Sequence, residues 1–409
     1  MQAWLEIALW KRILGAMLLG IVVGLLMHTS SVVLAPIGEL FLNAIKMLIV
    51  PLLFFSLVSG ISTMADPKRM GRVGMKAFGL YLLTTFLAIS LGLLISTLSQ
   101  PGAGVEIASQ PVVLPERSDT WGDALVNLVP PNPIASFAEG NVLQIIVFSL
   151  LFGIAITLAG EEGEPVARVC HAGAAVMYRL TRIVMELAPL GVFALMAVVA
   201  GNHGLDVLLP LLKMVLVFYI ACLLHAGLVL PAILHFVGRL RARRFFAGIV
   251  DAQAVAFSTA SSAGTLPVSL TCARENLGVS RPVASFVLPL GATINMDGTA
   301  IYQGIAAVFL AQAYGVELSL AHYLVIVFTS TLASIGTAGI PGAGLIMLSL
   351  VLQSVGLPLE GLALVAGVDR IMDMARTTVN VTGDLMISVL VAQSEGELDE
   401  SIFYQESEV

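Results

Sequence analysis

Six apolar segments, each about the length of a membrane-spanning helix, constrain this 409-residue chain more than any other feature. A helix needs ~20 mostly apolar residues to cross the hydrocarbon core of a bilayer. The segments are Trp10–Met27, Pro36–Ser62, Phe78–Leu98, Asn141–Gly160, Met185–Gly201 and Val207–Val237. Only 11% of the residues are charged, against roughly 25% in soluble domains. The sequence therefore predicts an all-α polytopic membrane protein and excludes a nucleic-acid binder or a soluble multidomain chain.

Lysine and arginine residues gather at one side of these spans, which indicates their orientation. They lie at the start of the first span, between the second and third, before the fifth and after the sixth. The opposite loops, Gln100–Pro130 and Asn202–Asp206, contain one arginine, Arg117, and no lysine. Because short loops rich in Lys and Arg stay in the cytoplasm, both termini are predicted to be cytoplasmic.

Two uncharged segments are too interrupted to be ordinary spans. Leu318–Leu359 has 42 residues without a charged side chain, and four glycines and a proline interrupt its middle, Ser334–Gly344. Glycine and proline break helices, so this segment is predicted to be a re-entrant hairpin that opens outward. Ala252–Ala273, whose middle Ala256–Pro267 is rich in Ser and Thr, is predicted to be a second hairpin that opens to the cytoplasm.

Each predicted hairpin precedes a helix that carries polar residues at mid-membrane depth. Asn295–Thr299 follows the Ala252–Ala273 hairpin, and Asp369–Asp384 follows the Leu318–Leu359 hairpin. Interrupted segments at matching positions of two inverted halves are the best sequence indication of a transporter's binding site. The pattern therefore predicts inverted repeats around a central site.

The last helix carries a polar stripe whose members are spaced by four, three, four and four residues and fall within about 80° of arc. They are Asp369, Asp373, Arg376, Asn380 and Asp384. Burying such charges is costly unless they are paired. Three carboxylates against one guanidinium leave an excess of negative charge, which sodium ions or a substrate ammonium would neutralise. The alternative is a structural ladder of ion pairs.

Two further polar clusters are candidate binding elements. Asn295 and Asp297 stand at a helix break beside Gly298, and a carboxylate with released carbonyls suits a hard cation; a hydrogen-bonded packing pair is the alternative. Ser261 and Ser262 belong to a hydroxyl-rich helix end whose amides can bind a carboxylate, although small residues also serve helix packing. The cysteines and histidines show no disulfide or metal-ligand spacing.

Several motifs together resemble the glutamate transporter family, the dicarboxylate/amino acid:cation symporters, over almost the whole chain. They are KMLIVPL, YLLTT, STASSAGTLP, GATINMDGTAIYQ, ASIGTAGIPGAG and DRIMDMARTTVNVTGD. The resemblance implies a homotrimer in the inner membrane, with eight transmembrane helices and two re-entrant hairpins in each protomer. A scaffold would hold the trimer, and a mobile transport domain would carry substrate across like an elevator.

The resemblance also implies a division of the chain. Residues 1–72 would form scaffold helices 1 and 2, and residues 73–99 would form helix 3 of the transport domain. Residues 100–201 would contain an external loop and scaffold helices 4 and 5. Residues 202–395 would form the rest of the transport domain, and residues 396–409 an acidic cytoplasmic tail.

The family pattern implies a substrate site in which Asp373 binds an ammonium, Arg376 a side-chain carboxylate and Asn380 the α-carboxylate. Its other members would be Ser261, Ser262, Thr299, Ile340, Gly344 and Thr377, with Asp369 behind Arg376. Three sodium sites are implied as well. The first would use Asp384 with Gly291, Asn295 and Asn380; the second Thr293, Ser334, Ile335 and Thr337; the third Tyr81, Thr84, Thr85, Asn295 and Asp297.

The predicted function is import of aspartate or glutamate coupled to sodium ions, without enzymatic activity. A proton-coupled carrier and a C4-dicarboxylate carrier are the alternatives within the family. Gln303 stands where proton-coupled animal members carry a glutamate, and Asp373 favours a substrate with an ammonium. An intramembrane serine hydrolase is a remote alternative, because a serine nucleophile needs a Lys or His base and the serine-rich segment contains neither.

Overall fold

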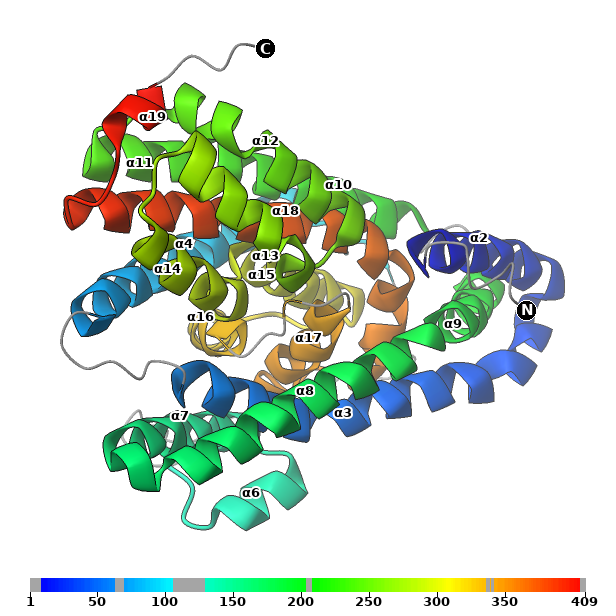
Figure 1. Ribbon diagram of the computed structural model, residues 1–409. Coiled ribbons are helices and arrows are strands. Elements are labelled where there is room, and N and C mark those ends of the chain that lie inside the picture. Colours follow the sequence, from blue (N-terminus) through cyan, green and yellow to red (C-terminus); the bar gives the residue numbers. More distant parts are fainter. Residues whose placement is uncertain are drawn as a thin grey trace, which may run out of the picture.

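The computed structural model describes residues 9–62, 70–105, 129–203, 208–335, 339 and 342–404. Within these ranges the chain folds into helices and contains no β-strand, which confirms the predicted all-α class. The helices form two groups by their packing (Figure 1).

The first group comes from two separate parts of the chain. It contains α2 (Leu9–Met27), η1 (His28–Leu34), α3 (Ala35–Ser62), α6 (Pro133–Glu139), α7 (Val142–Ala159), η2 (Gly160–Glu162), α8 (Glu164–Glu186) and α9 (Ala188–His203). Helix α2 packs along α9, and α3 packs against α7, α8 and α9 (Figure 1).

Helices α2 and α9 approach each other through glycines. Gly20 and Gly24 of α2 lie against the backbone of Phe193 and Ala197 in α9. A Cβ atom at Gly20 would stand 2.5 Å from the carbonyl oxygen of Phe193. Small residues four apart allow two helix backbones this proximity, which is a common way of packing helices in membranes.

Helix α8 is an element that the count of apolar spans missed. Its buried residues recur at intervals of three or four positions: Ala167, Cys170, Ala174, Met177, Thr181 and Val184. This is the spacing of a helix with one apolar face. Because charged residues such as Glu164, Arg168 and Arg179 lie among its exposed residues, a search for uniformly apolar segments does not find such a helix. Glu186, the last residue of α8, pairs with Arg12 near the start of α2, at 2.8 Å.

The second group surrounds one long helix, α18 (Leu362–Ser394) (Figure 1). Its other elements are α4 (Met70–Ser99), α10 (Leu208–Leu224), η4 (His225–Val229), α11 (Leu230–Gly238), α12 (Ala242–Thr259), α13 (Ser262–Thr271), η5 (Cys272–Asn276), α14 (Arg281–Ile294), α15 (Asp297–Ala313), α16 (Leu320–Ile335), α17 (Ala343–Ser354), η6 (Leu359–Gly361) and α19 (Glu400–Tyr404). Helix α9 of the first group also touches α18.

Both interrupted segments form helical hairpins. The first consists of α12 and α13, which meet at Ala260 in a left-handed conformation (φ 50°). Ser261 then caps α13 by accepting a hydrogen bond from the amide of Gly264 at 3.0 Å. Helix α12 begins at Ala242, ten residues before the predicted hairpin segment. The prediction started late because it was limited to uncharged residues, and the first turns of α12 carry charged residues on an exposed face. The second hairpin consists of α16 and α17.

The helix break at Asn295 is present, whereas α18 runs without interruption. Helix α14 ends at Ile294 and α15 begins at Asp297, with Asn295 and Met296 in non-helical conformations. The sixth predicted span is also modified, since a π-helical turn, η4, separates α10 from α11.

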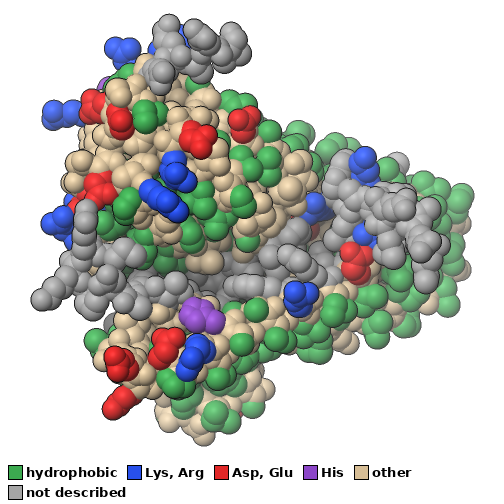
Figure 2. Space-filling model, viewed as in Figure 1, with side chains coloured by type: hydrophobic (Ala, Val, Ile, Leu, Met, Phe, Trp, Pro, Cys, Tyr) green, Lys and Arg blue, Asp and Glu red, His purple; other side chains and the backbone are tan. Residues whose placement is uncertain are grey.

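Three helical stretches among the described residues are long and apolar enough to cross a membrane: Lys11–Phe41, Gly71–Ser99 and Leu209–Gly238. Large apolar side chains are also exposed in quantity, for example Leu26 of α2, which is 74% exposed. Figure 2 shows hydrophobic side chains gathered over the end of the molecule formed by α2 and α9. Such a surface suits contact with lipid rather than water.

The chain after α18 is bound to the second group. The Glu395 carboxylate pairs with Arg72 and Lys76 of α4, with 2.6 Å to Lys76 Nζ. Leu398 bridges to Val279, and the Asp399 amide donates to the Gly278 carbonyl at 2.8 Å. The C-terminal segment therefore links the ends of α18 and α4 to the turn that precedes α14.

Candidate functional site

The polar stripe of α18 is buried along its whole length. Asp369, Asp373, Arg376, Asn380 and Asp384 all lie inside the second group of helices. The predicted helical spacing places them on one face, because α18 is continuous from Leu362 to Ser394. Each side chain therefore needs a buried partner, and the structure supplies one in every case.

Arg376 is the centre of an ion-pair network and only 2% exposed. Its Nη2 and Nε atoms donate to Asp373 Oδ1 at 2.6 and 3.0 Å, and its Nη1 donates to Asp369 Oδ1 at 3.2 Å. The ring of Tyr302 lies 4.5 Å from the guanidinium carbon. This cation–π contact and the two carboxylates fix the orientation of the guanidinium.

A small pocket, called here the Arg376 cavity, lies beside Arg376. Seven predicted substrate residues line it: Ser262, Thr299, Gly344, Asp373, Arg376, Thr377 and Asn380. Ser261 instead donates its hydroxyl to the Gly339 carbonyl at 2.8 Å. Ile340 lies outside the described residues.

Among the described residues, the tips of the two hairpins meet over this cavity at the Gly339 carbonyl. Gly339 accepts hydrogen bonds from the Ser261 hydroxyl at 2.8 Å and from the Ala263 amide at 3.0 Å. Gly339 and Ala260 both line the cavity. Both hairpins thus contribute residues to the wall of the same cavity.

Asn380 connects this cavity to the break between α14 and α15. Its side-chain oxygen accepts a hydrogen bond from the Gly298 amide at 2.8 Å. Gly298 has no room for a side chain, because a Cβ atom there would clash with the backbone of Arg376. Glycine at this position therefore lets α15 approach α18 closely.

A second polar cluster lies at the helix break. The hydroxyls of Thr84 and Thr85 donate to Asp297 Oδ1 at 3.1 and 2.9 Å. Asn295 donates to Asp384 Oδ1 at 3.0 Å. The structure thus brings α4, α14, α15 and α18 together around two buried carboxylates. Oxygen-rich surroundings of this kind are what hard cations bind.

Three other predicted sodium ligands, Tyr81, Gly291 and Thr293, make contacts of their own. Tyr81 donates its hydroxyl to the Val287 carbonyl at 2.8 Å. Gly291 packs against Asp384, so that a Cβ atom at Gly291 would lie 2.5 Å from Oδ1. Thr293 hydrogen-bonds within α14, to Leu290. Of the other predicted ligands, Ser334 is buried near the end of α16, Ile335 ends that helix and Thr337 lies outside the described residues.

His225 is a member of the second cluster that sequence reasoning missed. Its Nε2 lies 3.0 Å from Asp297 Oδ2, and the side chain is 0% exposed. It begins the π-helical turn η4. Histidine spacing gave no indication of this role, because His225 pairs with a carboxylate instead of joining other histidines. π-turns are often found at functional sites, but they leave no mark in the sequence.

Arg370 was also missed, and it adds a buried charge beside the polar stripe. It lies beside Asp369 on α18 but about 100° around the helix from it. Its Nη1 is 3.6 Å from Asp373 Oδ2. The buried network therefore contains two guanidiniums, so the excess of carboxylates along α18 is three against two instead of the predicted three against one. An ionisable residue inside an apolar helix is a functional candidate by itself, which would have identified it.

Comparison with known proteins gives a consistent result. Residues 9–394 match the sodium:dicarboxylate symporter family. The chain is 36% identical over 403 residues to a proton/sodium-glutamate symport protein of Bacillus caldotenax, covering 96% of this chain and 95% of the relative.

Two further relatives differ in their described substrates. A proton/glutamate-aspartate symporter of Escherichia coli (strain K12) is 38% identical over 415 residues, which cover 97% of this chain and 94% of the relative. A C4-dicarboxylate transport protein of Bacillus subtilis (strain 168) is 35% identical over 398 residues, 95% of this chain and 94% of the relative. The predicted resemblance is confirmed: this chain belongs to the sodium:dicarboxylate symporter family and is a membrane transporter, not an enzyme.

Proposed function

We propose that the protein imports aspartate or glutamate by symport with sodium ions. The observation that carries this proposal is the cavity beneath the hairpin tips, which has a guanidinium and a carboxylate on its wall, Arg376 and Asp373. An acidic amino acid offers an additional carboxylate to the first and an ammonium to the second. Two of the relatives are named as symporters of glutamate or of glutamate and aspartate.

The cluster around Asp297 and Asp384 supports sodium as the coupling ion. Both carboxylates are buried beside hydroxyl and amide oxygens. Asn295 donates to Asp384 and accepts from the Thr84 hydroxyl, which also lies within hydrogen-bond distance of Asp297. This ligand chemistry suits a hard monovalent cation. We propose that Asp384 and Asp297 belong to two sodium sites, and that ions at these sites favour the closed arrangement of the hairpins.

The movement proposed for transport is an elevator. The packing of the helices into two groups supports it, since the two hairpins, the helix break and the polar stripe all belong to the group around α18. That group would move as a body, while α2, α3 and α9 would remain fixed in a homotrimer. We place the trimer in the inner membrane with both termini in the cytoplasm.

Uptake into proteoliposomes tests the function. We expect labelled aspartate to accumulate when sodium is imposed outside, and unlabelled glutamate and aspartate to compete with it. Arg376→Cys should abolish this uptake, because a bidentate contact with the side-chain carboxylate is lost. Unchanged aspartate affinity in Arg376→Cys would contradict the assignment.

Proton coupling is the second candidate, because the names of two relatives include the proton. The same vesicles distinguish the ions. Uptake that runs equally well on a proton gradient without sodium would replace sodium coupling by proton coupling, while the substrate assignment would remain.

A further inference from the structure

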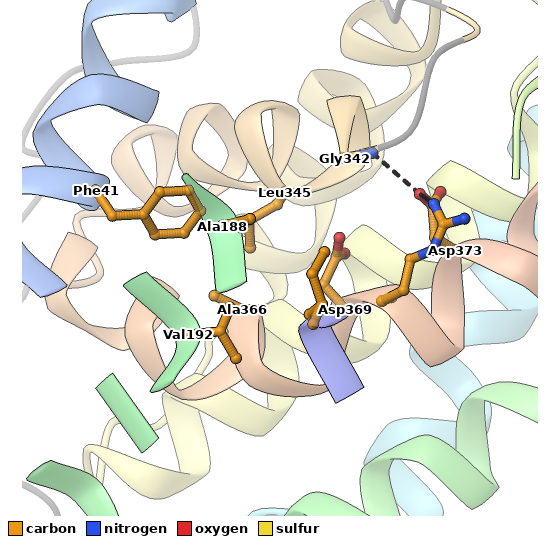
Figure 3. Close-up of a pocket in the computed structure, with 10 residues that line it drawn as sticks. Phe41, Ala188, Val192, Gly342, Leu345, Ala366, Asp369 and Asp373 are labelled. Carbon is orange, nitrogen blue, oxygen red and sulfur yellow. Dashed lines mark hydrogen bonds and ion pairs between the residues drawn. The ribbon is translucent and has the colours of Figure 1, made fainter. Parts of the chain in front are cut away.

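A second small cavity lies between α18, α17 and the first group of helices. Its walls from α2, α3 and α9 are apolar, whereas α18 contributes Asp369, Arg370 and Asp373. Figure 3 shows Phe41, Ala188 and Val192 on the apolar side and Asp369 and Asp373 opposite. Asp373 lines this cavity as well as the Arg376 cavity.

Asp373 uses its two oxygens on different partners. Oδ1 accepts both hydrogen bonds from Arg376, at 2.6 and 3.0 Å. Oδ2 accepts from the Gly342 amide at 3.0 Å, the bond marked in Figure 3, and lies 3.6 Å from Arg370 Nη1. One carboxylate therefore stands between two guanidiniums.

Arg370 has hydrogen-bonding capacity to spare. Its side chain is 8% exposed, and its one hydrogen bond between described residues is a long one, from Nη2 to the Thr259 carbonyl at 3.4 Å. Its buried Nε atom has no partner among the described residues. A buried guanidinium with unused donors can strengthen a contact with a nearby carboxylate when that carboxylate loses another partner.

Binding of a substrate carboxylate to Arg376 would weaken one of the partners of Asp373. Arg376 donates to Asp373 through Nη2 and Nε, and a fork of two donors is what a substrate carboxylate needs for bidentate binding. A substrate carboxylate that binds Arg376 therefore shares its positive charge with Asp373, which weakens the pairing between Asp373 and Arg376. An amino acid compensates by offering its ammonium to Asp373, but a dicarboxylate without an amino group offers nothing.

We propose that Arg370 is a specificity-determining residue that neutralises Asp373 when the substrate has no ammonium, so that the pocket accepts C4-dicarboxylates as well as acidic amino acids. The proposal rests on the proposed function, because it takes the cavity beside Arg376 as the substrate site. Arg370 acts through Asp373 and from the second cavity, without touching the substrate.

Competition in proteoliposomes tests this role. The probes are unlabelled aspartate and unlabelled succinate, each measured against uptake of labelled aspartate and also as labelled substrates by themselves. In Arg370→Gln we expect the inhibition constant of succinate to rise about a hundredfold, since an uncompensated buried charge is strongly unfavourable. That of aspartate should change by less than about tenfold, because its ammonium pairs with Asp373. Arg281→Gln, at an exposed arginine of the same helical group, is the matched control.

A double variant separates specificity from folding. In Arg370→Gln/Asp373→Asn the unpaired carboxylate is absent, so succinate affinity should return to within about tenfold of the wild-type value, while aspartate affinity is lost. A merely structural role for Arg370 would not be rescued by a second substitution.

The outcomes also distinguish the two proposals. Aspartate uptake without any competition by succinate in the wild type overturns the role of Arg370 and leaves the proposed function intact. Equal losses for both substrates in Arg370→Gln overturn it too. Succinate uptake without aspartate uptake, lost in Arg370→Gln and restored in the double variant, supports Arg370 and overturns aspartate import.

Discussion

Arg376 is held at three of its nitrogens by Asp369 and Asp373 and stacks on Tyr302. Three of its five N–H donors are used in this way, which fixes the orientation of the guanidinium and leaves two donors for a further acceptor. A substrate carboxylate therefore meets a guanidinium that is already oriented. The same rigidity makes substitution at Arg376 or Asp373 severe, since either leaves the other charge buried and unpaired.

At the second polar cluster, which contains the proposed sodium ligands, we predict that Asp384→Asn weakens the dependence of uptake on sodium and lowers aspartate affinity at limiting sodium. Ion and substrate favour the same closed state, so their coupling must be reciprocal. The measurement is the sodium concentration for half-maximal uptake at low and high aspartate, with Asp399→Asn in the C-terminal segment as control. An unchanged sodium dependence would remove Asp384 from the cation sites.

His225 offers a second test at the same cluster. His225→Ala leaves Asp297 Oδ2 without its buried partner, which costs about 1–3 kcal/mol. We expect the sodium concentration for half-maximal uptake to rise, and to rise less in His225→Gln, whose amide can donate to the carboxylate. Equal effects of Ala and Gln would show that the histidine fills space and does not orient Asp297. His322→Ala, outside this cluster, serves as the control.

Among the elements, the glycine contact between α2 and α9 has the clearest consequence for stability. In Gly24→Val the new side chain meets the carbonyl of Ala197, and we expect a loss of about 1–3 kcal/mol from overpacking. The thermal midpoint of the purified protein in detergent measures it. Gly15→Val is a matched control in the same helix, since no atom lies within 4 Å of its Cβ position. Equal midpoints for the two variants would contradict the packing argument.

The elements also show what the sequence can and cannot predict. The hairpin α16–α17 and the break at Asn295 were predictable, because glycine, proline and an Asn-Met-Asp-Gly sequence interrupt apolar helices visibly. Helix α8 was predictable only from periodicity, which a count of apolar residues ignores. The pairing of His225 with Asp297 was not predictable, since it depends on a π-turn and on residues 72 positions apart.

For the whole molecule, the link between α4 and the end of α18 predicts a defined pH dependence. Hydrogen bonds from Arg72 and Lys76 lower the pKa of Glu395 to about 2. A lowered pKa in the folded state adds stability that is fully present above the ordinary carboxyl pKa of about 4.3 and is lost as the pH falls toward the folded value. We therefore expect Glu395→Gln to lower the thermal midpoint by the same amount between about pH 5.5 and pH 8.

This comparison has a clear contrary outcome. A difference between wild type and Glu395→Gln that changes between about pH 6 and pH 8 would show that the Glu395 carboxylate is not the group responsible. Glu400→Gln, at an exposed glutamate of α19, is the control and should leave the midpoint unchanged.

The continuity of α18 also has a mechanical meaning. Asp369 and Asp384 are fifteen residues apart, or about 22 Å along a helix axis, and no glycine break or proline kink separates them as one separates α14 from α15. Under the proposed function, one continuous helix therefore joins the residues proposed to bind substrate to those proposed to bind sodium. A spectroscopic probe attached to α18 would then report the displacement of both together.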